Sequence, residues 1–141
     1  MTQRKAHRGL DFGALCHAIE RCEPDLILNF YAEEANLSIV SADAPHALPF
    51  ELRGKTEIAK HLRVAFNQET SHRVEEEVVG EDRVMFREAC KYLDGGRVVV
   101  ETTLEVHDGK IVRQVDIVTK NAPLDREEEI SRGPSFRTPH P

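Results

Sequence analysis

Three acidic side chains, Glu88, Glu101 and Asp116, are the candidates for proton-transfer chemistry in this sequence. Each lies in a strand-like segment that nearby turn signals place beside the others. Carboxylates a few ångströms apart in a dry cavity cannot all be ionised, so at least one would hold a proton near neutral pH. General acid–base catalysis needs carboxyl groups whose pKa values differ in this way. We therefore predict Asp116 as the base, with Glu88 or Glu101 as its proton partner.

Two turns set the expected register of the strands that carry these acids. A two-residue turn at Asp108-Gly109 places Glu101 opposite Asp116. A turn at Gly95-Gly96 places Cys90 opposite Glu101. Directly opposed residues share a face of a sheet, so one predicted face holds Phe86, Glu88, Cys90, Tyr92, Val99, Glu101, Thr103, Glu105, Val112, Gln114, Asp116 and Val118.

The opposite face of these strands is largely apolar. Its members include Val98, Val100, Leu104, Val106, Val115 and Ile117. In one interpretation this face packs on the helices, and the carboxylates are solvated. In the other, the carboxylate face lines a cavity and a second subunit covers the apolar face, which predicts a homodimer through the outer face of the sheet. An error of one residue in either turn would exchange the faces.

The elements that position these residues follow from hydrophobic periodicity and turn residues. Helical spacing predicts helices over 10–22, from Pro24 to about Ala35, and over 55–67. A short strand is expected at 36–40, followed by an irregular segment to Gly54. Segments rich in β-branched and aromatic residues predict strands at 72–79, 83–93, 97–107 and 110–120. The order predicts an α+β domain, with an antiparallel sheet and helices on one side.

Length and charge limit the number of domains and the classes of partner that this chain can have. The chain has 141 residues, which fits one domain at 10–120, with weakly ordered tails at 1–9 and 121–141. Its formal charge of -6 argues against nucleic acid and anionic membranes as partners. It has neither a membrane-spanning segment nor a secretory signal, and its three cysteines form no disulfide framework, so we expect a cytoplasmic protein.

Three short motifs carry a resemblance to a known family. They are Glu23-Pro24-Asp25-Leu26 through Tyr31-Ala32-Glu33-Glu34-Ala35, then Arg53-Gly54-Lys55 with Ile58, and Gly109-Lys110-Ile111-Val112. In order and spacing they resemble the SnoaL-like branch of the nuclear-transport-factor-2-like superfamily, which includes polyketide cyclases, ketosteroid isomerases and limonene epoxide hydrolases. The resemblance implies a cone in which a strongly curved, mainly antiparallel sheet wraps around three N-terminal helices and encloses a pocket. It also implies dimers formed through the outer face of the sheet.

The resemblance transfers the site of the hydrolase-like members only in part. Those members have an Asp six residues after a Lys in the last strand, as Asp116 follows Lys110. Their second acid falls at Glu88, but the Arg between the two acids falls at Phe86. Their water-holding Tyr and Asn fall near Leu37 and Ile39.

The isomerase-like site transfers less well. Its base falls at Ile39, its oxyanion Tyr at about Leu15, and its oxyanion acid at Thr103. The missing groups leave a non-catalytic ligand carrier or interaction module as the alternative to an enzyme.

Further side chains complete the predicted pocket. Gln114 and Thr103 would position a substrate, Tyr31 would reach the cavity rim with its hydroxyl, and His17 would face the cavity from the first helix. Phe86, Cys90 and Val118 would form the rest of the wall, whereas His61 and His72 are expected at the surface or an edge. No metal-ligand spacing is present, so we expect no metal and no cofactor. The predicted function is isomerisation, cyclisation, dehydration or hydrolysis of a small apolar molecule.

Overall fold

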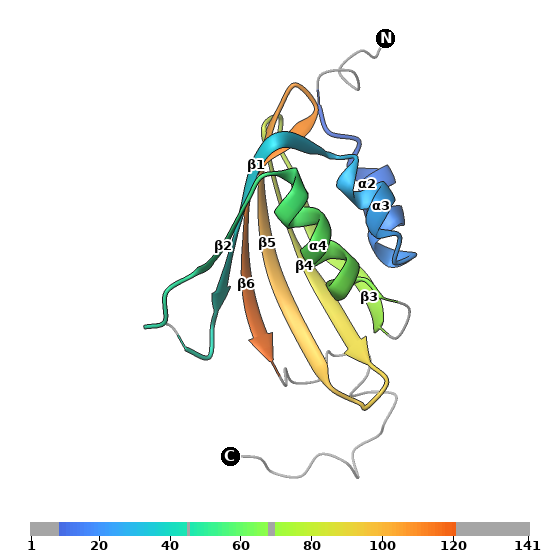
Figure 1. Cartoon of the computed structure of the whole chain (residues 1–141). Helices are drawn as coiled ribbons and strands as arrows, with labels where there is room; N and C mark the ends of the chain where they lie inside the picture. Colours follow the sequence, from blue (N-terminus) through green and yellow to red (C-terminus); the bar gives the residue numbers. More distant parts are fainter. Residues whose placement is uncertain (1–8, 45, 68–69, 121–141) are drawn as a thin grey trace.

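A computed structural model describes residues 9–44, 46–67 and 70–120, so the predicted tails lie almost wholly outside the described residues. Within these described residues, three helices and six strands follow one another (Figure 1). They are α2 (Phe12–Glu20), α3 (Pro24–Leu28), β1 (Tyr31–Ser41), β2 (Phe50–Arg53), α4 (Lys55–Ala65), β3 (Thr70–Val79), β4 (Arg83–Tyr92), β5 (Arg97–His107) and β6 (Lys110–Lys120). None of the described helices is long and apolar enough to cross a membrane.

The six strands form one sheet in the order β2-β1-β6-β5-β4-β3. Neighbours are antiparallel except β1 and β6, which run parallel. Register shifts interrupt three ladders, between Tyr31 and Asn36, between Glu75 and Val78, and between Glu105 and Val106. Such bulges bend a strand and increase its twist. The expected curved α+β architecture is confirmed.

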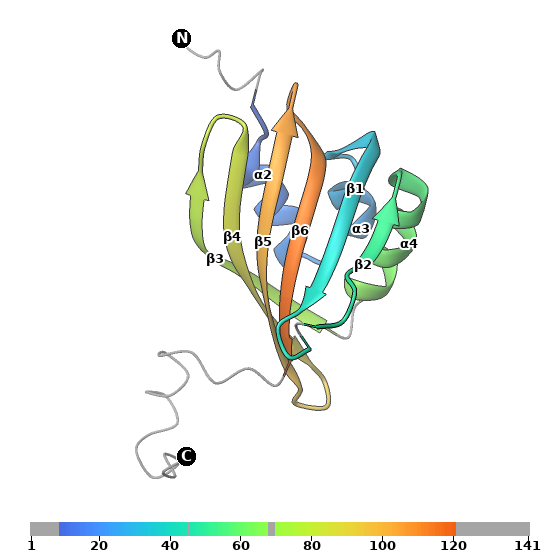
Figure 2. The same cartoon turned by 90° about the vertical axis from the view of Figure 1, so that its left-hand side faces the viewer.

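The helices lie on the concave side of the sheet (Figure 1). In the view turned by 90°, which faces the sheet, the strands lie in front of α2 and α3 (Figure 2). Apolar residues from both layers form one core, including Leu15, Ile27, Ile58, Leu62, Val84, Leu104 and Ile111. Asp11 begins α2 by accepting a hydrogen bond from the Ala14 amide at 3.1 Å, as an N-cap residue does. The core therefore lies between the helices and the concave face of the sheet, and the described helices leave the convex face uncovered.

Two local predictions are wrong. The second helix ends at Leu28 instead of continuing to Ala35, because residues 31–35 join β1. Their Ala and Glu residues favour a helix, but pairing with β6 outweighs that preference; the Ile111 amide donates to the Phe30 carbonyl at 2.8 Å. Part of the segment expected to be irregular is β2, an edge strand paired with β1.

The predicted register of β5 is also wrong on both of its sides. The β4–β5 loop is longer than two residues, since the last ladder pair is Lys91 with Arg97. The β5–β6 turn begins as predicted, but the shift after Val106 then places Thr102, and not Glu101, opposite Asp116. Each error shifts the register by an odd number of residues, so the side chains of β5 point to the opposite face of the sheet from the predicted one.

The turned strand changes both faces of the sheet. Glu101 and Thr103 lie on the convex face, where Glu101 is exposed and Thr103 half-buried. Four residues expected on the outer face lie on the concave one: Val98, Val100, Leu104 and Val106. The convex face therefore has less apolar area than the homodimer prediction assumed.

Candidate functional site

A small cavity lies between the helices and the concave face of the sheet. Its volume is about 40 Å³, which is room for a few water molecules. The wall combines apolar side chains with five polar ones. Its members are Leu15, Ile19, Ile27, Tyr31, Leu37, His61, Leu62, Phe66, Phe86, Glu88, Leu104, Ile111, Gln114 and Asp116.

Asp116 is the central ionisable group of this cavity. It lies on β6 and is 9% exposed. One of its two carboxyl oxygens accepts two hydrogen bonds. Thr102 Oγ1 and Gln114 Nε2 each donate to Asp116 Oδ1 at 2.9 Å. No hydrogen bond reaches Oδ2 from the described part of the chain. The carboxyl group is thus fixed by one oxygen, with the other available to a molecule in the cavity.

Burial sets the proton affinity of Asp116. The pKa of Asp116 is raised from 3.8 to about 7, chiefly because burial removes water from the charged form. The hydrogen bonds from Gln114 and Thr102 lower it in part, and the negative charge of Glu88 raises it. Both protonation states are therefore populated near neutral pH. A group with this pKa can serve as an acid or as a base.

A chain of hydrogen bonds links Asp116 to β1. The Tyr31 hydroxyl donates to Gln114 Oε1, and the Gln114 amide donates in turn to Asp116. Burial, with the charges of Asp116 and Glu88, raises the pKa of Tyr31 well above its usual range. The hydroxyl therefore stays protonated, and the side-chain amide of Gln114 has one orientation.

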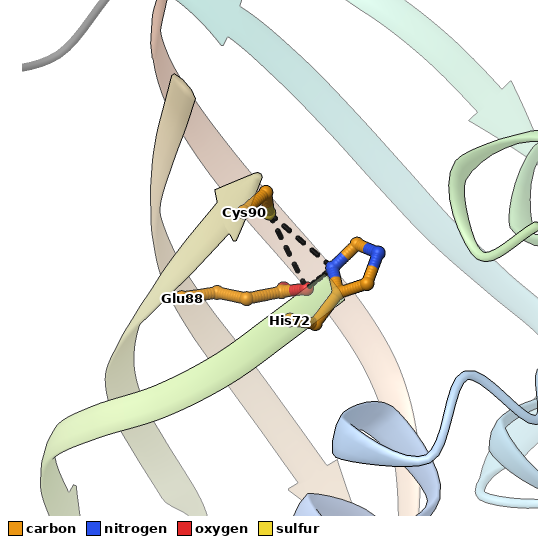
Figure 3. A group of neighbouring side chains, drawn as sticks. All are labelled: His72, Glu88 and Cys90. Atoms are coloured by element: carbon orange, nitrogen blue, oxygen red, sulfur yellow. Dashed lines mark hydrogen bonds and ion pairs between the residues drawn. The ribbon is translucent and has the colours of Figure 1, made fainter. Parts of the chain in front are cut away.

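A second polar group lies beside the cavity and combines His72 from β3 with Glu88 and Cys90 from β4. All three side chains are buried and point toward one another (Figure 3). His72 Nδ1 lies 2.5 Å from Glu88 Oε2 and 3.3 Å from Cys90 Sγ, and Cys90 Sγ lies 3.7 Å from Glu88 Oε2. We call these residues the His–Glu–Cys cluster. Of the three, Glu88 lines the cavity.

The partners of the other ring nitrogen determine how His72 is protonated. His72 Nε2 lies 3.2 Å from the Ala65 carbonyl, which can only accept. Nε2 also lies 2.8 Å from Thr70 Oγ1, whose hydroxyl donates to the Asn67 carbonyl at 3.0 Å. Nε2 therefore carries a hydrogen, and a single proton is shared between Nδ1 and the Glu88 carboxylate.

The helix side of the cavity contributes His61 from α4. This side chain is half-buried, and desolvation lowers its pKa. Its imidazole is accordingly neutral near pH 7 and can accept or donate a proton. The expectation that His61 and His72 lie at the surface is wrong: the first lines the cavity, and the second, although it belongs to the edge strand β3, is 8% exposed.

The structure brings five of the predicted site residues into the cavity wall. They are Tyr31, Phe86, Glu88, Gln114 and Asp116. Cys90 is buried next to Glu88 without lining the cavity, and Val118 is half-buried further along β6. The structure does not bring in the other three predicted residues, Glu101, Thr103 and His17.

The physical reasons differ for these three residues. Glu101 and Thr103 lie on the convex face because of the register of β5, and Thr102 takes the place intended for Thr103. His17 lies on the exposed side of α2, where its ring is 3.4 Å from the Arg21 guanidinium. Thr102, His61 and His72 are the members that the sequence analysis missed. A correct β5 register would have found Thr102, and an inward-facing alternation on β3 would have suggested His72.

Known proteins resemble this chain in sequence and in structure. The sequence matches the SnoaL-like domain over residues 12–114. An NTF2-like protein of unknown function from Mesorhizobium loti is similar in structure, with a TM-score of 0.65 and 21% identity over 76% of this chain and 86% of that one. No curated protein matches the sequence.

Two further solved structures carry functional descriptions. A putative ketosteroid isomerase from Kribbella flavida has a TM-score of 0.61 and 15% identity, covering 87% of each chain. The epoxide hydrolase/cyclase-like enzyme SalBIII, described in pyran ring formation in the polyether salinomycin, has a TM-score of 0.57 and 14% identity over 76% of this chain and 86% of that one. At these identities the likeness shows the fold.

Proposed function

This chain belongs to the SnoaL-like domain family, and from its cavity we propose that it is an acid–base enzyme that rearranges a small, largely apolar molecule. The observation that carries the proposal is Asp116, with one oxygen held by Thr102 and Gln114 and the other available in an apolar cavity. Isomerisation, cyclisation, dehydration and hydrolysis all use a proton-transfer group of this kind. Two proteins of similar structure, described as a putative ketosteroid isomerase and an epoxide hydrolase/cyclase-like enzyme, support this class.

In the proposed mechanism, Asp116 moves the proton. Its ionised carboxylate removes a proton from the substrate through Oδ2 and, once protonated, returns it to another atom. The hydrogen bonds to Oδ1 keep the group in place during both transfers. His61, in its neutral form, lies on another part of the wall, and so does Glu88. Both are candidates for a second proton transfer. The sequence analysis left Glu88 and Glu101 as alternatives for the proton partner. We retain Glu88, because Glu101 lies on the other face of the sheet.

The volume of the cavity limits what can enter without movement. Pockets for organic ligands usually measure about 300–1,000 Å³, whereas this one measures about 40 Å³. Most of the helix side of the wall is formed by apolar side chains such as Leu62 and Phe66. A substrate of more than a few heavy atoms must displace them, so binding would be coupled to a movement of this wall.

The experiment follows one elementary step in a size series of simple ketones. Acetone, 2-butanone and cyclohexanone are incubated with the protein in heavy water, and exchange of the hydrogens next to the carbonyl is followed by NMR. We expect exchange faster than in buffer alone, increasing with pH around a midpoint near 7 as Asp116 ionises. Asp116→Asn should remove the acceleration, and Glu101→Gln, on the convex face, should keep it.

The size series also tests the volume argument. Acceleration for acetone but not for cyclohexanone would indicate a rigid wall, and acceleration for all three would indicate a wall that moves. Equal rates for wild type and Asp116→Asn with every ketone would contradict proton transfer by Asp116 in this class of substrate.

The small volume favours a second candidate, a non-catalytic member of the family that binds another protein; a non-catalytic ligand carrier would need the same movement of the wall as the enzyme. In that case the polar network would serve to fix the fold. Ketone titrations that shift NMR signals of the cavity residues, without any exchange that depends on Asp116, would favour the ligand carrier. Absence of both effects would favour the interaction module.

A further inference from the structure

The His–Glu–Cys cluster has a geometry that hydrogen bonding alone does not require, since three potential metal ligands point at one place. We propose that His72 Nδ1, Glu88 Oε2 and Cys90 Sγ bind a divalent transition-metal ion of the zinc class. The three atoms lie within 4.8 Å of one another, and all three residues are buried. Neither the sequence spacing nor the family match assigns a metal to this chain.

The sheet explains why the three side chains converge. His72 on β3 is paired directly with Cys90 on β4, and opposed residues point to the same face. Glu88 precedes Cys90 by two residues and therefore also faces inward. Two ordered strands thus hold the ligands, and this backbone support does not depend on a metal.

The distances are close to those of a tetrahedral site. Zinc–ligand bonds of about 2.0–2.3 Å place neighbouring ligand atoms about 3.3–3.6 Å apart. The two distances from Cys90 Sγ are 3.3 Å to His72 and 3.7 Å to Glu88. The 2.5 Å between His72 Nδ1 and Glu88 Oε2 must open by about 0.8 Å. A side-chain rotation of that size replaces the shared proton with the ion.

The outer contacts of His72 supply a second, independent observation. Metal-bound histidines nearly always donate the other ring N–H to a backbone carbonyl, a carboxylate or water. His72 Nε2 already does this with the Ala65 carbonyl and Thr70 Oγ1. Phe66 stacks on the ring with centroids 4.3 Å apart, which fixes the plane of the imidazole. Nδ1 is consequently the nitrogen left for a ligand.

Charge balance permits the ion in this buried position. Binding releases two protons, one from the Cys90 thiol and one from the His72–Glu88 pair. The products are a thiolate, a carboxylate and a neutral imidazole, whose two negative charges cancel the charge of the ion. A neutral assembly avoids the large cost of an unpaired buried charge. Three protein ligands leave a fourth position for water, and the adjoining cavity has volume for it.

Cobalt(II) is the probe, because a thiolate bound to cobalt gives a charge-transfer absorption in the near ultraviolet that other ligands do not give. The chelator-treated full chain is titrated with cobalt and then with zinc. We expect one cobalt ion per chain with this band, loss of the band when zinc displaces cobalt, and no displacement by magnesium, which prefers oxygen ligands.

Matched variants identify the ligands. Cys90→Ala should abolish the thiolate band, whereas Cys16→Ala and Cys22→Ala should retain it. Glu88→Gln keeps an acceptor for His72 but loses the charge, so it should weaken cobalt binding more than about 10-fold. Circular dichroism of each variant checks that it is folded. A band that survives Cys90→Ala, or wild type that gives no thiolate band, would overturn the proposal.

Proton release provides a readout that needs neither a spectrum nor a substrate. Calorimetric zinc titrations in buffers of different ionisation enthalpy should give two protons released per ion near pH 7. Release of none would contradict the proposed ligand set. Asp116→Asn should still bind cobalt, because Asp116 is not one of the proposed ligands. The metal proposal and the acid–base proposal can therefore fail independently of each other.

Discussion

Replacing Asp116 with Asn should make the protein more stable at neutral pH and should do so in a pH-dependent way. The Asn side chain has the shape of the protonated acid, and its oxygen can accept the same hydrogen bonds from Thr102 and Gln114. It cannot ionise. The variant therefore reports what ionisation of Asp116 costs the folded state.

The magnitude follows from the two pKa values. Asp116 has a pKa of about 7 in the folded protein against 3.8 when unperturbed. Between these values the unfolded chain has lost its proton while the folded protein retains it, so wild-type stability falls as pH rises, by about 1.4 kcal/mol per pH unit. The full cost is roughly 4 kcal/mol above pH 7, and below pH 3.8 it vanishes.

The assay is urea unfolding of both proteins from pH 5 to pH 8, with a chelator present to exclude metals. The advantage of Asp116→Asn over wild type should grow by roughly 3 kcal/mol between pH 5 and pH 7 and then level off. Glu101→Gln is the control, because surface changes usually alter the free energy of unfolding by less than about 0.5 kcal/mol. A wild-type–Asn difference that stays constant across this range would refute the assigned ionisation of Asp116.

Three other predictions concern neighbouring features. Thr102→Val removes a hydrogen bond that lowers the pKa of Asp116, so the midpoint of the pH-dependent stability should move to higher pH in the same urea series. Tyr31→Phe leaves Gln114 Oε1 buried without its donor, and thermal or urea unfolding should show a loss of about 1–3 kcal/mol. The homodimer is a proposal that now depends on convex residues such as Met85 and Ile117, which are 47% and 40% exposed. Light scattering should give twice the chain mass of 16.0 kDa, and Met85→Glu should shift it toward the monomer; a wild-type monomer at micromolar concentration would contradict the proposal.

The prediction that Glu88 and Asp116 share a face is met because two register errors cancel. The longer β4–β5 loop and the bulge in the β5–β6 ladder each turn β5 over, so Glu88 and Asp116 still share a face while Glu101 leaves it. Turn residues such as Gly95-Gly96 indicate that a hairpin exists, but not how many residues the loop contains. The bulge could not be read from the alternation of polar and apolar residues, because the inward-facing positions of β6 include the polar residues Gln114 and Asp116.

Other differences arise where tertiary contacts outweigh local preference. The stretch from Tyr31 to Ala35 has the composition of a helix but completes the sheet beside β6. The sequence places His72 at the surface or an edge, because it flanks the third predicted helix. Its burial depends on three partners, Ala65 from α4 and Glu88 and Cys90 from β4, which no local pattern brings together. The helices and most strands, in contrast, follow from periodicity and turn residues alone.

The position of β6 between β1 and β5 has a consequence for how the molecule assembles. β6 is the last of the six strands along the chain, yet it is a central one, and it pairs with a partner about 80 residues earlier. Contacts so distant in sequence require closure of a long loop, which slows folding. Until β6 inserts, β1 and β5 have exposed edges that can pair with other chains. Since β6 carries Gln114 and Asp116, the candidate site is complete only when β6 has paired with both neighbours. Any intermediate that lacks the β1–β6 pairing would have an exposed strand edge and an incomplete site.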